Sequence, residues 1–170
     1  MTEPTFRIRP ISEADRAWVA SLLTQQWGSP LSVSRGKCLD AAALPGFLAE
    51  RTTERLGLVT YHLVGRDCEV VTLNSLAGGM GIGTALLKAV QEKASDAGAE
   101  RIWLITTNDN VTALEFYQKR GFVLAHLHRD AVTESRRMKP QIPLVAANGI
   151  PIRDELELEL ILKHAHQHRD

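Results

Sequence analysis

Hydrophobic and polar positions change their spacing several times along the chain, and each change predicts a new element. An alternating stretch at residues 6–9 predicts a short strand. Ser12, with Asp15 three residues later, resembles a capping box and predicts a helix that ends at residue 25 or 26. The following segment, residues 27–46, is interrupted by glycine and proline, so we expect mostly loop there, with a short helical option around residues 40–44.

The middle of the chain predicts an antiparallel meander followed by two helical crossovers. The three strand-like runs of the meander cover residues 47–51, 58–64 and 69–76. From Gly81 the apolar residues recur every three or four positions, which predicts a helix that ends at Gly98. A strand at 101–107, a helix from Asn110 to Gly121 and a strand at 122–127 follow, so we expect these crossovers to join neighbouring strands of a mixed sheet.

The last third of the chain predicts one more helix and one more strand. Residues 131–139 have a helical pattern, and a loop rich in proline and glycine follows them. Leucine and glutamate then alternate over residues 155–160; both residue types favour helices, but the strict period of two favours a half-buried strand. We therefore expect one domain over residues 1–162, with residues 163–170 as a polar tail in which histidine occurs at every second position.

Composition indicates a single domain and gives no sign of nucleic-acid or membrane binding. The chain has 170 residues, which favours a single compact domain, and its 20 basic and 20 acidic side chains give no broad field for attracting nucleic acid or anionic membranes. No apolar run approaches the length of about 20 residues that a membrane span needs. The two cysteines, Cys38 and Cys68, have neither a CxxC spacing nor a nearby partner, so we expect no metal site and a cytoplasmic location.

A glycine-rich turn joins the strand that ends near Leu76 to the helix that begins after Gly81. Unpaired amides at a helix N-terminus can hold a phosphate, and glycines let its oxygens approach the backbone. The Gly-Lys-Ser/Thr of a Walker loop is absent. A Gly-x-Gly-x-x-Gly dinucleotide fingerprint fails as well, because its last position would fall on Thr84 or Leu86. A tight turn that binds no ligand remains the structural alternative.

A second motif follows the strand at 101–107 and reads Asn-x-x-Ala-x-x-Phe-Tyr-x-x-x-Gly-Phe from Asn110 to Phe122. Together, the two motifs resemble the acyl-CoA-binding motifs of GNAT acetyltransferases, whose pyrophosphate loop is usually Gln/Arg-x-x-Gly-x-Gly/Ala. Gly78 stands here where that family has Gln or Arg. The resemblance covers about residues 6–127. It implies an α+β fold in which a mixed, mostly antiparallel sheet of six to seven strands carries helices on both faces.

The resemblance also implies which residues carry the chemistry. Acetyl-CoA would be the co-substrate, with its pantetheine arm between the strands at 70–76 and 101–107 and with no metal. Tyr117 would be the general acid for the departing thiolate, Glu69 the candidate base, and the Leu73 amide the donor to the thioester carbonyl. The cofactor would contact Leu73, Asn74, Ser75, Leu76, Gly79, Met80, Gly81, Ile82, Gly83, Thr84, Asn108, Asn110, Ala113, Phe116 and Tyr117.

Each of these residues also has a purely structural interpretation. Tyr117 could be a core tyrosine, Glu69 a solvated residue at a strand end, and Cys68 a small strand residue rather than a nucleophile. For the acceptor pocket, plausible lining residues are Trp27, Arg35, Tyr61, Asn74, His126, His128 and Arg129.

Three functions are compatible with these motifs. The leading one is an N-acetyltransferase that moves an acetyl group to a primary amine of a small molecule or peptide by direct attack. A noncatalytic acyl-CoA-binding module and an interaction domain without a cofactor are the alternatives. A homodimer is a common state for soluble domains and for this family.

Overall fold

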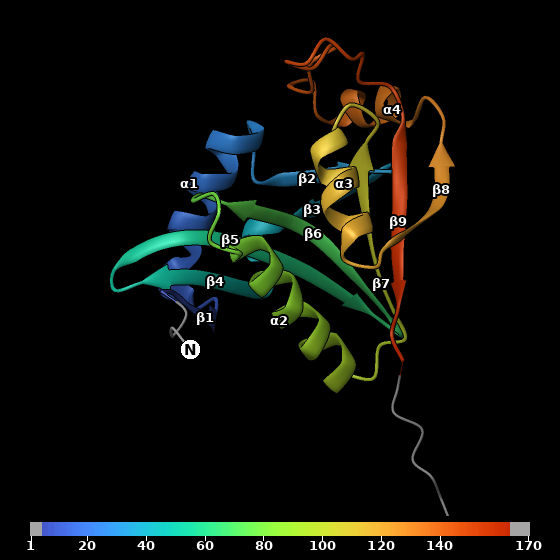
Figure 1. Ribbon diagram of the computed structural model, residues 1–170. Helices are drawn as coiled ribbons and strands as arrows, with labels where there is room; N and C mark the ends of the chain where they lie inside the picture. Colours follow the sequence, from blue (N-terminus) through green and yellow to red (C-terminus); the bar gives the residue numbers. More distant parts are fainter. Residues whose placement is uncertain (1–4, 164–170) are drawn as a thin grey trace, which may run out of the picture.

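The computed structural model describes residues 5–163, which form one twisted sheet with helices on both faces (Figure 1). The strands of this sheet are β1 (Arg7–Pro10), β4 (Gly46–Arg51), β5 (Glu54–Val64), β6 (Asp67–Ser75), β7 (Arg101–Thr107), β8 (Val123–His128) and β9 (Glu155–Ile161). A separate hairpin consists of β2 (Leu31–Ser34) and β3 (Lys37–Asp40). The helices are the short η1 (Glu13–Asp15) and η2 (Ala41–Ala43), and α1 (Arg16–Trp27), α2 (Ile82–Asp96), α3 (Val111–Lys119) and α4 (Ala131–Met138).

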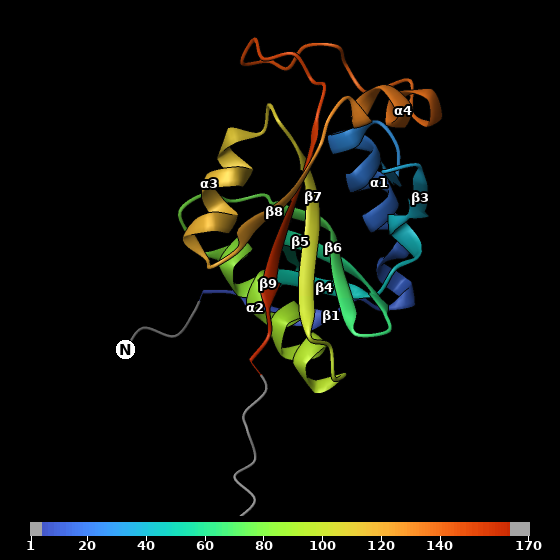
Figure 2. The same ribbon diagram turned by 90° about the vertical axis from the view of Figure 1, so that its right-hand side faces the viewer.

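The strand order in the sheet is β1-β4-β5-β6-β7-β9-β8. All neighbouring pairs are antiparallel except β6 and β7, which run parallel because α2 connects them as a crossover. The expected mixed, mostly antiparallel sheet of six to seven strands is thereby confirmed, with seven strands. The expectation that both crossovers join neighbouring strands is wrong for the second one, because β9 lies between β7 and β8 (Figure 2). The last strand of the chain fills that place because it pairs with both of them.

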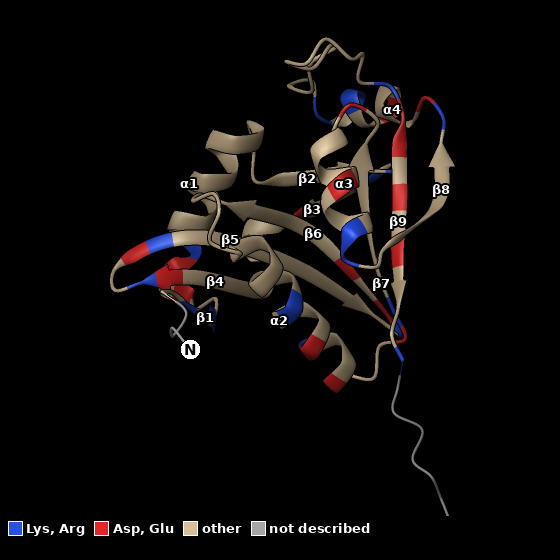
Figure 3. Cartoon of the chain, viewed as in Figure 1, with Lys and Arg blue, Asp and Glu red and all other residues tan. Residues whose placement is uncertain are grey.

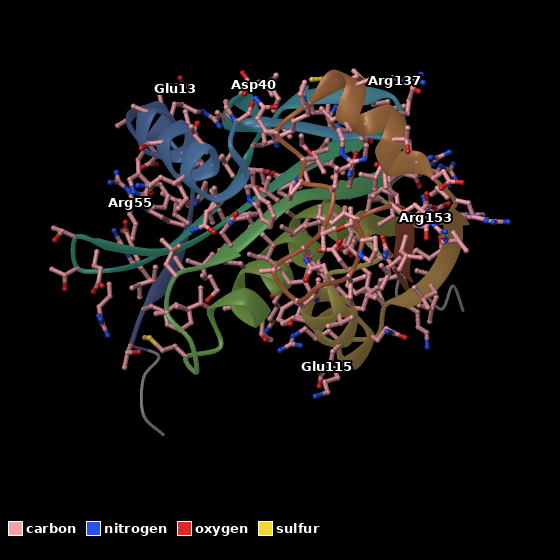
Figure 4. All side chains as sticks on the ribbon, turned by 90° about the horizontal axis from the view of Figure 1, so that it is seen from above. Glu13, Asp40, Arg55, Glu115, Arg137 and Arg153 are labelled. Atoms are coloured by element: carbon pink, nitrogen blue, oxygen red, sulfur yellow. The ribbon has the colours of Figure 1, made fainter. Side chains whose placement is uncertain are left out.

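Two layers of helices cover the sheet (Figure 4). Leu22 and Leu23 of α1 pack with Leu48 and Leu58 on one face. On the other face, α2 contributes a larger apolar cluster that also includes Tyr117. Because β5 lies between the two layers, its residues from 56 to 61 are all buried, and the strand does not alternate between buried and exposed positions there.

The segment between α1 and β4 differs from its sequence-based prediction. Residues 31–40 form the β2–β3 hairpin instead of a loop, and only the short helical option is confirmed, as η2. The turn of this hairpin is Arg35-Gly36, with φ of 50° and 73°. Positive φ at both central residues is the backbone of a tight two-residue hairpin turn. The sequence obscured this turn because arginine is seldom found at such a position.

The final strand is confirmed, but it is more buried than a half-buried strand. Leu158 has no exposed surface and faces the core on the α2 side. Glu155 and Glu157 are also buried, with 2% and 3% of their surface exposed. Figure 3 shows the acidic residues repeated along β9. A strand whose acidic face is buried needs cationic or hydroxyl partners on that face, and these partners help to define the site described below.

Candidate active site

The parallel strands β6 and β7 pair only at their beginning and then separate. Asp67, Cys68 and Glu69 lie opposite Arg101, Ile102 and Trp103, and no further pair follows. Beyond this point β6 stays paired with β5 on its outer side, and β7 stays paired with β9. The two strands begin together at the lower right of Figure 1 and diverge towards their C-terminal ends. Their facing edges therefore present main-chain groups that another extended group can bind.

A β-bulge in β6 redirects side chains at this opening. Thr72 lies opposite Thr60, whereas Val70 lies opposite Tyr61, so Val71 is the extra residue. After the bulge, Leu73 packs against the cluster on the α2 side. Asn74 lies opposite Leu58, is only 6% exposed, and its Oδ1 has no hydrogen-bond partner within residues 5–163. Ser75 and Leu76 are exposed at the end of the strand.

The glycine turn that follows β6 leaves its amides available to an anion. Gly79 and Gly81 have φ of 75° and 74°, and Gly81 caps α2. In the described part of the chain, no main-chain amide from Ala77 to Thr84 donates a hydrogen bond. A methyl group added at Gly78, Gly79 or Gly81 would meet nothing within 4 Å. Open space, unpaired amides and the positive end of the helix dipole together fit a phosphate group.

Gly83 also serves helix packing. A methyl group there would lie 3.2 Å from the ring of Phe116, so the glycine lets α3 pack closely against the first turn of α2. Arg120 completes this contact: its Nε donates to Thr84 Oγ1 over 2.9 Å, and its guanidinium lies 3.6 Å from the centre of the Phe116 ring. Within residues 5–163, Arg120 forms no ion pair. This cation beside the glycine turn is a candidate ligand that the sequence analysis missed.

Helix α3 begins and packs as its motif predicts. The Oδ1 of Asn110 accepts a hydrogen bond from the amide of Ala113 over 3.2 Å, which confirms the N-cap. Tyr117 is 8% exposed, and its ring packs against Phe116 and Phe122 with centroids 5.1 Å and 5.5 Å away. Burial raises the pKa of its hydroxyl, so the group stays protonated at neutral pH. No residue in the described part of the chain forms a hydrogen bond with that hydroxyl.

Asn108 has a structural task that the sequence did not reveal. Its Oδ1 accepts hydrogen bonds from the amides of Arg153 and Asp154, and its Nδ2 donates to the carbonyl of Pro151. The side chain therefore holds the segment that leads into β9. Its main-chain amide donates to the carbonyl of Asp154, so a cofactor would find only the carbonyl oxygen of Asn108 and the second hydrogen of Nδ2.

Glu69 belongs to the last residue pair before β6 and β7 separate, and it lines a small pocket. The other residues of the pocket are Ser32, Ser34, Arg35, Lys37 and Leu39 of the hairpin, and Trp103 of β7. Burial, and to a lesser extent the charge of Glu157, raise the pKa of Glu69 from 4.5 to about 7, although Lys37 lowers it. No hydrogen bond to its carboxylate is formed within residues 5–163. A partly ionised carboxylate without a partner, facing a pocket, can accept a proton near neutral pH.

Cys68 precedes Glu69 but faces the core. The side chain is fully buried, and burial raises the pKa of its thiol to about 12. Since the thiolate is the reactive form of cysteine, this thiol is a poor nucleophile at neutral pH. The interpretation of Cys68 as a small strand residue fits this environment.

The buried glutamates of β9 complete the wall beside Glu69. Glu157 accepts hydrogen bonds from Arg35 and Arg101, and His128 Nε2 lies 3.4 Å from its Oε1. Glu155 accepts a hydrogen bond from Ser135 Oγ of α4 over 2.6 Å. Among the other proposed acceptor-site residues, Trp27 is half exposed, His126 and Arg129 are exposed, and Tyr61 is buried in the core on the α2 side.

Comparisons with known proteins agree with this geometry. Residues 13–122 match the model of the acetyltransferase (GNAT) family. Two Bacillus subtilis (strain 168) proteins are similar over most of the chain. Uncharacterized protein YdhI is 46% identical over 153 residues, which are 88% of this chain and 94% of the relative. Uncharacterized protein YxbD is 41% identical over 154 residues, which are 90% and 97% of the two chains.

Solved structures share the fold. A Bacillus subtilis acetyltransferase in complex with CoA has a TM-score of 0.68 at 21% identity, covering 93% of this chain and 99% of that chain. A GNAT family acetyltransferase from Elizabethkingia anophelis with acetyl-CoA bound also has a TM-score of 0.68, at 20% identity, covering 94% and 100% of the two chains. At these identities the structures support the architecture, while residue roles rest on the geometry above.

Proposed function

The chain belongs to the acetyltransferase (GNAT) family, and from this premise we propose that it transfers the acetyl group of acetyl-CoA directly to a primary amine. The observation that carries this proposal is the position of Glu69. In the register of β6 and β7, Glu69 and Trp103 are the last residues that lie opposite each other before the strands diverge. A carboxylate with a pKa of about 7 therefore lies at the closed end of the opening between the strands. An amine held there would lose its proton next to a thioester held in the opening.

The cofactor side of the site has groups for each part of acetyl-CoA. The amides of the glycine turn and the guanidinium of Arg120 would bind the pyrophosphate. The free edges of β6 and β7 would bind the amide groups of the pantetheine arm. Acetyl-CoA supplies an activated acyl group, while the protein aligns it with the amine and excludes water.

Proton transfers at two side chains would balance the reaction. Glu69 takes the proton of the ammonium group, and the free amine attacks the thioester carbonyl, whose oxygen is stabilised by the amide of Leu73. As the new N–C bond forms, the C–S bond breaks, and the hydroxyl of Tyr117 donates its proton to the thiolate. The raised pKa of Tyr117 keeps that proton available at neutral pH. The attacking nitrogen then passes its second proton to the phenolate of Tyr117, which restores the hydroxyl, and Glu69 releases its proton to water. No acetyl group is attached to the enzyme at any stage.

Substitution of Tyr117 by phenylalanine tests this assignment and separates an enzyme from a binding module. We expect kcat in a thiol-release assay to fall, with the Kd for acetyl-CoA nearly unchanged, because the ring still fills its place between Phe116 and Phe122. The matched control is Tyr61→Phe, since Tyr61 is buried in the core and stacks on Phe47. Equal kcat for Y117F and the wild type would remove Tyr117 from the mechanism.

A further inference from the structure

The β2–β3 hairpin presents one polar face to Glu69. In its register Ser34 lies opposite Lys37, and Ser32 lies opposite Leu39, so these four side chains share one face. All four line the pocket that contains Glu69. Within residues 5–163, the hydroxyls of Ser32 and Ser34 form no hydrogen bonds. This face therefore offers two hydroxyl donors and one ammonium group to whatever enters the pocket.

Bonds at both of its ends hold the hairpin in place. At the turn, the amide of Arg35 donates to Glu155 Oε2 and its Nη1 donates to Glu157 Oε1, each over 3.1 Å. Arg35 has a φ of 50°, a left-handed backbone that costs energy for a side chain of this size, and these two bonds to buried carboxylates offset that cost. At the other end, Lys139, the residue directly after α4, donates to the carbonyl of Leu31 over 3.0 Å. The polar face is thus fixed over Glu69.

Opposite charges face each other across the pocket without touching. Lys37 forms no ion pair with any residue between positions 5 and 163, and neither does Glu69. They are nevertheless close enough for the charge of Lys37 to lower the pKa of Glu69 against the larger effect of burial. Lys37 would repel a second positive charge on an acceptor and attract a negative one. Trp103 and Leu39 supply apolar surface for the carbon atoms between the two charged groups.

Resting on the proposed function, we infer that the acceptor is a small amine that also carries a carboxylate, as an α-amino acid does. Its ammonium group lies at Glu69, and its carboxylate accepts hydrogen bonds from Lys37 and Ser34. The pocket is complementary to a zwitterion because it holds a carboxylate and an ammonium that do not neutralise each other. A diamine would place one of its two charges beside Lys37, which disfavours polyamines as acceptors.

The test compares acceptors that carry an anionic, a neutral or a cationic group beside the reacting amine. The kcat/KM values of several L-amino acids are compared with those of the matching amino-acid amides and of alkyl diamines. Each value is divided by the fraction of acceptor in the ammonium form, because that is the form that lies at Glu69. We expect the wild type to favour the amino acids by about tenfold or more. Lys37→Glu should reverse this order, and Ser34→Ala should reduce it. Lys88→Glu is the matched control, because Lys88 is exposed on α2 and the change of charge is the same.

The outcomes separate this inference from the function on which it rests. Acetylation of amides or diamines in preference to amino acids would refute the zwitterion but leave the acetyltransferase intact. An unchanged preference in Lys37→Glu would refute the role of Lys37, provided that the variant shows the wild-type melting temperature and the wild-type Kd for acetyl-CoA. If the wild type neither binds acetyl-CoA nor releases thiol with any amine, the proposed function itself fails.

Discussion

Replacement of Glu69 by glutamine should remove both the catalytic base and the pH dependence of kcat/KM near pH 7. Burial raises the pKa of Glu69 from 4.5 to about 7, so the carboxyl group is mostly protonated at pH 6 and mostly ionised at pH 8. Only the ionised form accepts a proton, so kcat/KM of the wild type should rise about tenfold between pH 6 and pH 8. Glutamine has nearly the same shape but cannot act as a base. We therefore expect Glu69→Gln to lower kcat/KM by about a hundredfold to ten-thousandfold.

The same substitution should stabilise the fold. A carboxyl group whose pKa is raised in the folded state favours folding below pH 4.5, and this contribution is lost as the pH rises through about 7. A shift of this size corresponds to about 3 kcal/mol for a fully buried group. Because Glu69 is partly exposed, solvent screening reduces the expected gain at pH 8 to about 1 kcal/mol. If the Glu69→Gln variant loses activity but gains stability, Glu69 serves the reaction at the expense of the stability of the fold.

The assay is thiol release at saturating acetyl-CoA from pH 5.5 to 9, alongside thermal unfolding at pH 5 and pH 8. Glu115→Gln is the control, because Glu115 is exposed and, among residues 5–163, forms an ion pair only with Lys119 of its own helix. The rise in kcat/KM near pH 7 should vanish in Glu69→Gln and persist in Glu115→Gln. If the rise persists in Glu69→Gln, another group is the base.

Three further substitutions test the rest of the site and the packing of the core. Tyr117→Phe should lower kcat about a hundredfold while the Kd for acetyl-CoA, measured calorimetrically, changes less than about twofold. Arg120→Ala should weaken acetyl-CoA binding about tenfold through the loss of a charge-assisted hydrogen bond, whereas Lys119→Ala should leave the Kd unchanged. Equal Kd values for Arg120→Ala and the wild type would exclude Arg120 as a ligand. Gly57→Ala should lower the free energy of unfolding by about 1–3 kcal/mol in urea denaturation, because its methyl group would lie 2.6 Å from a side-chain carbon of α2, whereas Gly78→Ala has open space and should be neutral.

Periodicity predicted the elements whose side chains face a single core. The strand at 101–107 and the helix after Gly81 lie within a residue or two of their expected bounds, because their apolar spacing is regular. The β2–β3 hairpin was missed because its polar face points to a pocket instead of a core, and its turn uses Arg35 in place of glycine or asparagine. Leu31 and Val33 do alternate with Ser32 and Ser34, but over four residues only, and the flanking Pro30 and Gly36 favour a loop.

In the candidate site, too, some features could be predicted from the sequence and others could not. The glycine turn and the Asn110 cap depend on local backbone chemistry, so a short motif is enough to find them. Contacts between distant segments leave no such trace. The Arg120 bond to Thr84 joins residues 36 positions apart, and the bonds from Arg35 to Glu155 and Glu157 span 120 and 122 positions. Neither contact can be inferred from spacing along the chain.

Single-turnover experiments that follow the acetyl group distinguish direct transfer from transfer through an acetylated enzyme. Stoichiometric enzyme and acetyl-CoA are mixed with and without an amino-acid acceptor, and thiol release and the intact mass of the protein are followed together. Direct transfer predicts thiol release that depends on the acceptor and equals the N-acetylated product formed, with an unmodified protein at every time. Thiol release without acceptor, accompanied by an acetylated protein, would contradict direct attack of the amine on the thioester.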